Sequence, residues 1–447
     1  MENNLLVGYA RVDATPMLGI TMRGYFRVRR AEAILDPIEI CAIAFASGDT
    51  KVVALTFDVC AFPEDTALDL RSHIAEVNGL PLEAVYLHAT HTHTAPFVDK
   101  EFKDCLEQEY YRSVYHKMAD VAKFALEDLK PAKMGYATGV APEVAFIRRY
   151  KMKDGTIRTN PGIGNPDVVG PVGEADHRVN VLRFNREDGT TVILGNYGNH
   201  PDTICGEKIS ADWPAFVRRQ VEQALPDSKC IFFTGAQGDV NHWNVQPSFP
   251  TTELMFDAGE MQRNHRFSQS VARAISGTIL QQFDRARYCP VDSIRIKQMT
   301  VQLPSNRPTP EQMPEARRIH ELYSTGRGNE IPYTGMMWTT VVAEARRMIN
   351  LEHGPDYFPM NLHGIALGNV ALLGIPGEPF TGIGVELKKA PGWDLVLPCC
   401  LVNGSVGYFP MMDSYEEGGY EARSSRFKAG VAEHIIAEGT KLLGELR

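Results

Sequence analysis

The 447-residue sequence has little of what marks membrane, secreted or nucleic-acid-binding proteins. No run approaches the ~20 apolar residues of a membrane helix, so we expect no membrane span. The opening residues, MENNLLVGYARVDATP, lack the apolar stretch of a secretory signal. Basic residues (46) are outnumbered by acidic ones (55), and the net charge of −9 argues against nucleic acid as a partner.

Paired cysteine motifs are also missing. The eight cysteines are scattered, none forms a CxxC pair, and several lie in apolar runs, such as Cys41 in IEICAIAF. Such cysteines are typical of buried, reduced thiols, and disulfides are rare in the cytoplasm. Together with the opening residues, they lead us to expect a cytoplasmic protein.

The composition is that of a globular protein, with 44% hydrophobic and 23% charged residues. Strand-like and helix-like segments alternate, with several hairpins, and no clear linker divides them. This pattern predicts an α/β fold: a single large domain over residues 1–447, with a mixed β-sheet core flanked by helices. Residues 136–175 look instead like a long Gly- and Pro-rich loop with either a binding role or only a surface position.

The segment AVYLHATHTHTAP, residues 84–96, is the clearest candidate for chemistry. Val85 to Leu87 favour a buried strand, and side chains two apart on a strand share a face. His91 and His93 would then point the same way, and neutral imidazole is a common zinc ligand. The spacing also fits a pair of hydrogen-bonded histidines in a polar loop.

Other site-type residues follow further strands. His200 lies in GNHPDT after one strand, Tyr408 lies in a loop after another, and Glu378 stands at a strand-to-helix junction. Glu378 could instead complement the dipole of the following helix. Asp58 also ends a strand, and we interpret it as a helix cap rather than a site carboxylate. Because ligands gather outside strand ends in α/β sheets, we expect one metal site there.

Five motifs, in this order, resemble the catalytic domain of the neutral, non-lysosomal ceramidases, a family of zinc-dependent amidases. They are THTHTAP, GNHPDT, GAQGDVN, IPGEPFT and NGSVGYFPMMDSYEEGGYEA, and the resemblance runs from about residue 7 to about residue 425. It implies a Zn²⁺ ion with four ligands: His91, His200, Glu378 and Tyr408.

The resemblance also implies catalytic roles. His93 would support the metal or act in catalysis, Arg148 would reach the substrate, and Tyr420 would face the reacting carbonyl. Asn241 stands where the family has a serine, so it can donate a hydrogen bond but offers no nucleophilic hydroxyl. Ser405 replaces a tyrosine of the last motif, and the chain ends soon after that motif. These departures favour a soluble small-molecule substrate over ceramide.

We therefore expect a zinc-dependent hydrolase that cleaves an amide, an ester or a lactone of a small molecule through a metal-bound water. Two alternatives stay open: a metal-dependent isomerase or lyase acting on a polyhydroxylated metabolite, and a non-catalytic ligand-binding protein. The sequence leaves the oligomeric state open and is compatible with a homo-oligomer.

Overall fold

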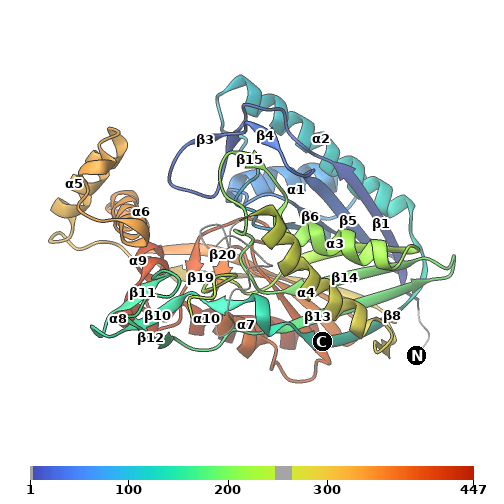
Figure 1. Ribbon diagram of the computed structural model, residues 1–447. Coiled ribbons are helices and arrows are strands. Elements are labelled where there is room, and N and C mark those ends of the chain that lie inside the picture. Colours follow the sequence, from blue (N-terminus) through green and yellow to red (C-terminus); the bar gives the residue numbers. More distant parts are fainter. Residues whose placement is uncertain (1–3, 247–263) are drawn as a thin grey trace.

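The computed structural model describes residues 4–246 and 264–447, and its core is two stacked β-sheets with helices on both outer sides (Figure 1). The larger sheet has the order β16-β14-β13-β8-β1-β5-β6-β7, with β18 beside β8. The β14–β16 and β6–β7 pairs are parallel and the other pairs antiparallel, so the predicted mixed sheet is confirmed. Its strands are β1 (Leu6–Asp13), β5 (Glu39–Ser47), β6 (Thr50–Phe57), β7 (Val85–Ala89), β8 (Lys130–Val140), β13 (Arg178–Arg186), β14 (Thr191–Tyr197), β16 (Ser228–Thr234) and β18 (Arg287–Cys289).

The second sheet packs face to face on the first. It has the order β19-β20-β21-β23, and its strands are β19 (Ile294–Pro304), β20 (Tyr357–Leu367), β21 (Val370–Gly374) and β23 (Leu395–Cys399). Alternation along β5 shows how one strand serves two layers: Ile43 and Phe45 enter the core between the sheets, whereas Ile40 and Ala42 pack under helices. The hydrophobic core predicted around one mixed sheet is therefore built from two sheets, whose facing side chains pack together.

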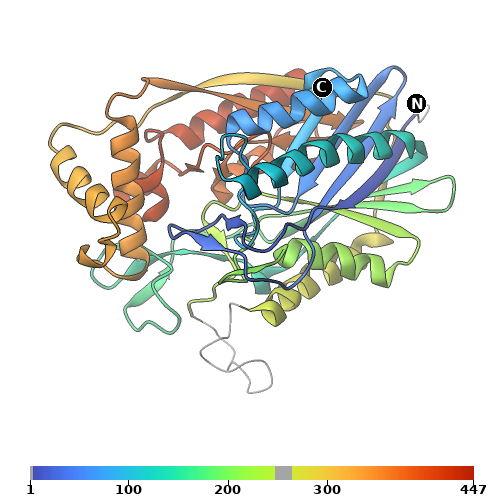
Figure 2. The same ribbon diagram turned by 90° about the horizontal axis from the view of Figure 1, so that it is seen from above.

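Helices cover both outer faces (Figures 1 and 2). α1 and α2 pack on the β5–β7 side of the larger sheet, and α3 and α4 on its β13–β16 side. α7 and α10 cover the second sheet, while α5 and α6 form a pair that stands apart. The bounds are α1 (Glu64–Asn78), α2 (Cys105–Glu127), α3 (Asp212–Ala224), α4 (His265–Phe283), α5 (Met313–Ser324), α6 (Gly335–Leu351), α7 (Thr381–Leu387) and α10 (Val431–Leu446).

The remaining elements are short. Within the predicted long loop, β10 pairs with β11 and β12, and β9 pairs with β17, so that expectation was wrong. The turn residues between these short strands interrupt the alternation of apolar and polar residues, so the sequence pattern does not reveal the strands. The short elements are β2 (Thr21–Met22), β3 (Arg29–Arg30), β4 (Ala33–Ile34), β9 (Phe146–Ile147), β10 (Arg149–Met152), β11 (Ile157–Thr159), β12 (Val168–Pro171), β15 (Lys208–Ile209), β17 (Val240–Asn241), β22 (Glu378–Pro379), β24 (Tyr408–Phe409), α8 (Asp413–Glu417), α9 (Tyr420–Ser424), η1 (Leu82–Ala84), η2 (Pro142–Val144) and η3 (Gly328–Glu330).

Asp58 is not a helix cap. α1 begins after Pro63, and the buried carboxylate of Asp58 instead receives two hydrogen bonds from Arg218, at 3.0 and 2.6 Å. Burial raises the pKa of Asp58 despite the opposing charge of Arg218. A buried pair of this kind is costly to break because it leaves one charge without its partner. Asp58 thus joins the end of β6 to α3.

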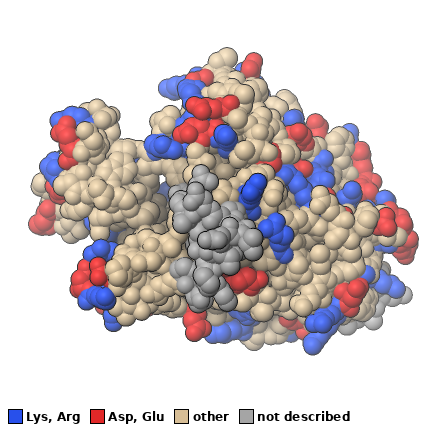
Figure 3. All heavy atoms as spheres, in the orientation of Figure 1, with Lys and Arg blue, Asp and Glu red and all other residues tan. Residues whose placement is uncertain are grey.

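The surface matches the mixed charge of the sequence. On the face in Figure 3, basic and acidic side chains are interspersed among uncharged ones, outside the atoms drawn in grey. Among the described residues, no helix is long and apolar enough to cross a membrane.

Candidate metal centre

Three side chains from distant parts of the chain converge at one end of the larger sheet. The Oε2 atom of Glu378 lies 3.2 Å from Nε2 of His91 and 3.1 Å from Nε2 of His200. All three residues are buried, with 4% of His91, 1% of His200 and 7% of Glu378 exposed. Two imidazole nitrogens and one carboxylate oxygen form a donor set that suits zinc. These are three of the four ligands expected from the sequence.

His91 reaches this position by a route that differs from the expected one. β7 ends at Ala89, and His91 has a φ of 79°, so its backbone is in the left-handed region. The argument that His91 and His93 share one strand face was therefore wrong, although their Nε2 atoms do lie 3.3 Å apart. A non-glycine residue in this region is uncommon, and it persists where the surroundings hold it. The backbone N–H of His91 donates to Val59 at 2.9 Å and helps to hold the turn.

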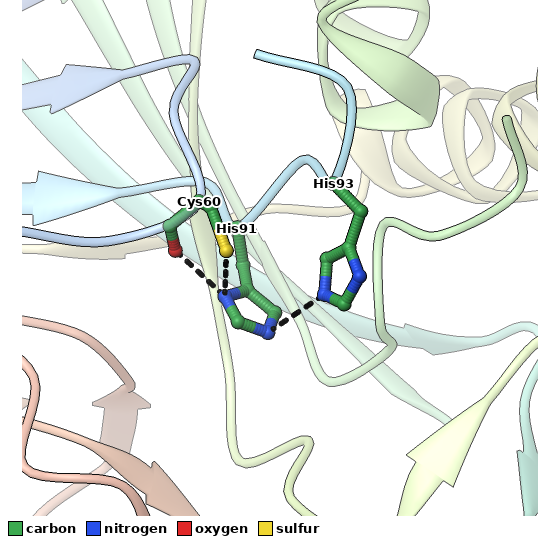
Figure 4. Close-up of side chains that lie close together, drawn as sticks. All are labelled: Cys60, His91 and His93. Carbon is green, nitrogen blue, oxygen red and sulfur yellow. Dashed lines mark hydrogen bonds between the residues drawn. The ribbon is translucent and has the colours of Figure 1, made fainter. Parts of the chain in front are cut away.

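Backbone carbonyls orient the imidazole rings of both His91 and His200. Nδ1 of His91 lies 2.7 Å from the Cys60 carbonyl oxygen, with the Cys60 thiol at 3.7 Å (Figure 4). Nδ1 of His200 lies 2.9 Å from the Gln237 carbonyl and 3.1 Å from that of Val240. A carbonyl oxygen can only accept, so each Nδ1 carries a hydrogen, and the neutral form of each ring presents the lone pair of Nε2 to the site. Metal-binding histidines commonly have this arrangement.

Strand pairing places Tyr408 next to Glu378. β22 and β24 pair in parallel with Glu378 opposite Tyr408, and the N–H of Glu378 donates to Gly407 at 2.9 Å. α7 begins only at Thr381, so the structure does not support a helix-dipole role for Glu378. Burial raises the pKa of Tyr408 well above its ordinary value, as does the nearby Glu378. The fourth expected ligand thus lies beside the triad.

Arg148 joins the triad to the tyrosines. Its Nη1 lies 3.2 Å from Nε2 of His200, its Nε donates to Glu421 at 2.6 Å, and its guanidinium lies 5.3 Å from the centre of the Tyr408 ring. The Tyr420 ring contacts that of Tyr408, with centroids 5.5 Å apart. Burial raises the pKa of Tyr420, which favours its neutral, hydrogen-donating form. The predicted residues Arg148, Tyr408 and Tyr420 therefore form one group.

Asn241 lies at the edge of the same site. It follows Val240, whose carbonyl oxygen accepts the backbone N–H of His200 at 3.3 Å. Its side-chain amide donates to Asn160 Oδ1 at 2.9 Å, and its Oδ1 accepts the N–H of Trp243 at 3.0 Å. Asn241 thus ties the segment after β11 to the loop that follows β16.

The electrostatics of the triad favour a cation. Burial opposes ionisation of Glu378, but His91 and His200 outweigh it and hold the pKa of this carboxyl well below its ordinary value. Burial also disfavours a charged His91, yet Glu378 raises the pKa of that ring. Burial, together with Arg148, lowers the pKa of His200. Among the described residues, Oε2 of Glu378 is buried without a hydrogen-bond partner, as a metal-binding oxygen would be. The residues fit a divalent metal.

Sequence reasoning missed several residues around this site. Cys60, Asp202 and Glu421 each contact a predicted site residue: His91, His93 and Arg148, respectively. Asp202 and Glu421 stand within two positions of His200 and Tyr420, so sequence proximity was the available signal. For Cys60 the sequence offers no signal beyond its place at a strand end.

The two sheets and the flanking helices form an α/β fold that is shared with solved ceramidase structures. The structure of neutral ceramidase from Pseudomonas aeruginosa matches with a TM-score of 0.73 and 15% identity, over 99% of this chain and 74% of that chain. A structure described as "Ceramidase complexed with C2" matches with a TM-score of 0.71 and 14% identity, over 99% and 76%. No family model and no curated protein matches the sequence. At these identities the likeness shows the fold.

Proposed function

We propose that this chain is a metal-dependent hydrolase that cleaves an amide, an ester or a lactone of a small molecule. The observation that carries the proposal is the buried triad of His91, His200 and Glu378, with both imidazole rings oriented by backbone carbonyls. Because segments from residue 60 to residue 421 supply the site, we also propose that residues 1–447 act as a single catalytic domain.

Zinc is the metal we propose, with His91, His200 and Glu378 as ligands and Tyr408 as a fourth. A zinc ion bound there would act as a Lewis acid and lower the pKa of a bound water towards 7. Tyr408 lies beside Glu378 through the β22–β24 pairing, which supports its place in the set.

The surrounding residues have the chemistry that acyl transfer needs. The buried Arg148 and the half-buried Tyr420 are hydrogen-bond donors on the Tyr408 side of the triad, where they can stabilise a developing oxyanion. His93 lies on the other side of His91 and can transfer a proton through Nε2. Asn241 has no hydroxyl, so we propose that it shapes the substrate's surroundings and forms no covalent intermediate.

The substrate we propose is a soluble amide, ester or lactone, with weak or no turnover of long-chain ceramide. The support is the replacement of the family serine by Asn241. All eight cysteines lie in the described residues and none is paired, which fits a reducing compartment, and we propose a cytoplasmic location.

Elemental analysis followed by turnover assays tests the proposal. Wild-type protein should hold one zinc per chain, His91→Ala and Glu378→Gln should lose it, and His353→Ala, which alters an exposed histidine, should keep it. Zinc-loaded protein should then hydrolyse members of a panel of N-acyl amides, esters and lactones.

Full zinc in His91→Ala would refute the ligand set. Zinc-loaded protein that acts only on sugar acids, by isomerisation or elimination, would refute the hydrolase and favour an isomerase or lyase. Zinc without any turnover would favour a ligand-binding role.

A further inference from the structure

α9 carries Tyr420, yet the chain that precedes this helix does little to fix where the tyrosine lies. α9 spans only Tyr420–Ser424, and a helix this short is unstable on its own. It follows Gly418 and Gly419, whose φ angles of 76° and 98° lie in the region that favours glycine, the least restricted residue. The position of Tyr420 in the site therefore depends on what packs against α9.

On the side of the metal triad, α9 is held through Glu421. This buried carboxylate accepts from Nε of Arg148 at 2.6 Å and from the hydroxyl of Thr159 at 2.9 Å. The N–H of Tyr420 also donates to Thr159, at 3.3 Å. These contacts lie at the start of α9, so they leave its C-terminal end to other partners.

α6 holds the C-terminal end of α9. Arg347, which is 8% exposed, donates through Nε to the carbonyl of Arg423 at 2.9 Å and through Nη1 to the carbonyl of Asn306 at 2.5 Å. The side chain of Arg423 in turn donates to Oε2 of Glu344, through Nε at 3.0 Å and also through Nη2. Glu344 and Arg347 are three positions apart on α6 and share one face of that helix, so they bind both the side chain and the backbone of one residue of α9.

The α5–α6 pair is itself fixed at a second point. Apolar side chains of α5 and α6 pack together, and Phe26 packs against the same cluster. On α5, the Tyr323 hydroxyl donates to the carbonyl of Phe26. Phe26 lies two positions after Gly24, where a Cβ atom would lie 2.8 to 2.9 Å from atoms of His93. The helix pair that stands apart in Figure 1 therefore connects α9 to the segment that contacts His93.

We propose that Arg347 and Glu344 are positioning residues that, through α9, fix the place of Tyr420 beside Tyr408. The inference rests on the proposed hydrolase function, in which Tyr420 stabilises the oxyanion, and it gives the α5–α6 pair a part in that reaction. Arg423 lies almost one helical turn after Tyr420, so a shift of this end of α9 moves the tyrosine as well. A displacement of about 1 Å at a reacting group can cost about 10²-fold in rate.

Steady-state kinetics of zinc-loaded variants tests the catalytic part. With 4-nitrophenyl acetate, or with the panel member that wild-type protein hydrolyses fastest, Arg347→Ala should lower kcat by about 10–10²-fold with little change in KM, because the oxyanion forms only after substrate has bound. Arg347→Lys, which can still donate to one of the two carbonyls, should recover part of the loss. Arg346→Ala is the matched control and should have the wild-type kcat, since Arg346 is exposed on the same helix. All three variants should hold one zinc per chain.

A double-mutant cycle separates positioning from a general structural effect. If Arg347 acts through Tyr420, the variant with both Arg347→Ala and Tyr420→Phe should match Tyr420→Phe alone within about twofold in kcat. A loss equal to the product of the two single losses overturns the inference, and so does loss of zinc from Arg347→Ala. Should Arg347→Ala fail to fold, Glu344→Gln provides the same cycle, because it keeps the size of the side chain and removes its charge.

Hydrogen exchange measures the hold on α9 without any substrate. Peptides that cover residues 420–425 should exchange about 10–100-fold faster in Arg347→Ala than in wild-type protein, as expected for the loss of a hydrogen bond from a charged group, while peptides from α10 should be unchanged. Unchanged exchange in α9 overturns the inference, and so does faster exchange with the wild-type kcat. If zinc-loaded wild-type protein hydrolyses no member of the panel, the proposed function fails, and the exchange rates still show whether α6 holds α9.

Discussion

His363 should make the protein sensitive to acid through a pair of hydrogen bonds that only the neutral ring can form. It lies on β20 between the two sheets, where its Nε2 is 2.9 Å from the carbonyl of Glu83 and its Nδ1 is 2.8 Å from Nδ2 of Asn403. Nε2 must donate and Nδ1 must accept, so a proton added to Nδ1 would face the N–H group of Asn403. Burial, with a contribution from Arg71, lowers the pKa of His363 to about 3.

The magnitude follows from the difference between the two states. The unfolded chain takes up a proton near pH 6.5 and the folded ring only near pH 3, so the folded pKa is the lower one. The contribution of His363 to the stability of the folded state is then complete above pH 6.5 and is lost as the pH falls towards 3. A pH of 5 lies about 1.5 units below the pKa of the histidine in the unfolded chain. Protonation therefore stabilises the unfolded state at pH 5, relative to pH 8, by about 2 kcal/mol at 1.36 kcal/mol per unit. That is a large share of the free energy of unfolding of a typical protein, which is roughly 5–15 kcal/mol.

Urea unfolding at pH 8 and pH 5 measures the effect. Wild-type protein should lose stability between these conditions, and His363→Gln, which can form similar hydrogen bonds but does not titrate, should lose about 2 kcal/mol less. The difference between the two proteins cancels the contribution of distant groups. His353→Gln, at an exposed position, is the control and should follow the wild type. If His363→Gln loses as much stability as the wild type, the neutral-ring argument is refuted.

Three further predictions concern the site and the thiols. Gly238→Ala should lower the zinc content, because a Cβ there would lie 2.5 Å from the carbonyl oxygen of Glu378. Gly170→Ala is the control and should bind zinc normally, because the space around Gly170 is open. Equal zinc content in the two variants would contradict the packing argument. His93→Ala and Tyr420→Phe should keep zinc and lose about 10²–10³-fold or more in kcat, as measured on any substrate of the panel, and a wild-type rate in either variant would remove that residue from the chemical step. Titration of denatured, non-reduced protein should find eight free thiols, and two missing thiols would indicate a disulfide.

Part of the candidate site could be anticipated from the sequence. His91, His200 and Glu378 each stand near a predicted strand end, the resemblance to the ceramidases implied them as ligands, and the structure brings their side chains together. The left-handed backbone conformation of His91 could not be predicted from the sequence, because tertiary contacts such as the hydrogen bond to Val59 hold it. The fold class was predictable for the same local reason, because alternating apolar strands and helices require layers.

What the sequence did not predict depends on pairs of residues far apart. Asp58 looked like a helix cap, and only the folded chain shows that Arg218, 160 positions later, neutralises it. The stacking of the second sheet on the first depends on which strand faces meet. A strand has the same alternation of apolar residues whether that face packs on a helix or on another sheet, so the sequence does not reveal the stacking. Asp202 was missed because a single acid next to a candidate ligand looks like an ordinary loop residue.

The wide spacing of the proposed ligands has a consequence for synthesis on the ribosome. Between His200 and Glu378 lie about 180 residues, which at about 5–20 residues per second take roughly 10–35 s to translate. During that interval the emerging chain has both histidines but neither the carboxylate nor Tyr408. We therefore expect zinc to enter late, after the second sheet has formed, and ribosome-stalled chains that end before Glu378 should retain no zinc where chains stalled well beyond Tyr408 do. On the proposed ligand set, a cell that makes this protein would have to supply the metal to a nearly finished chain.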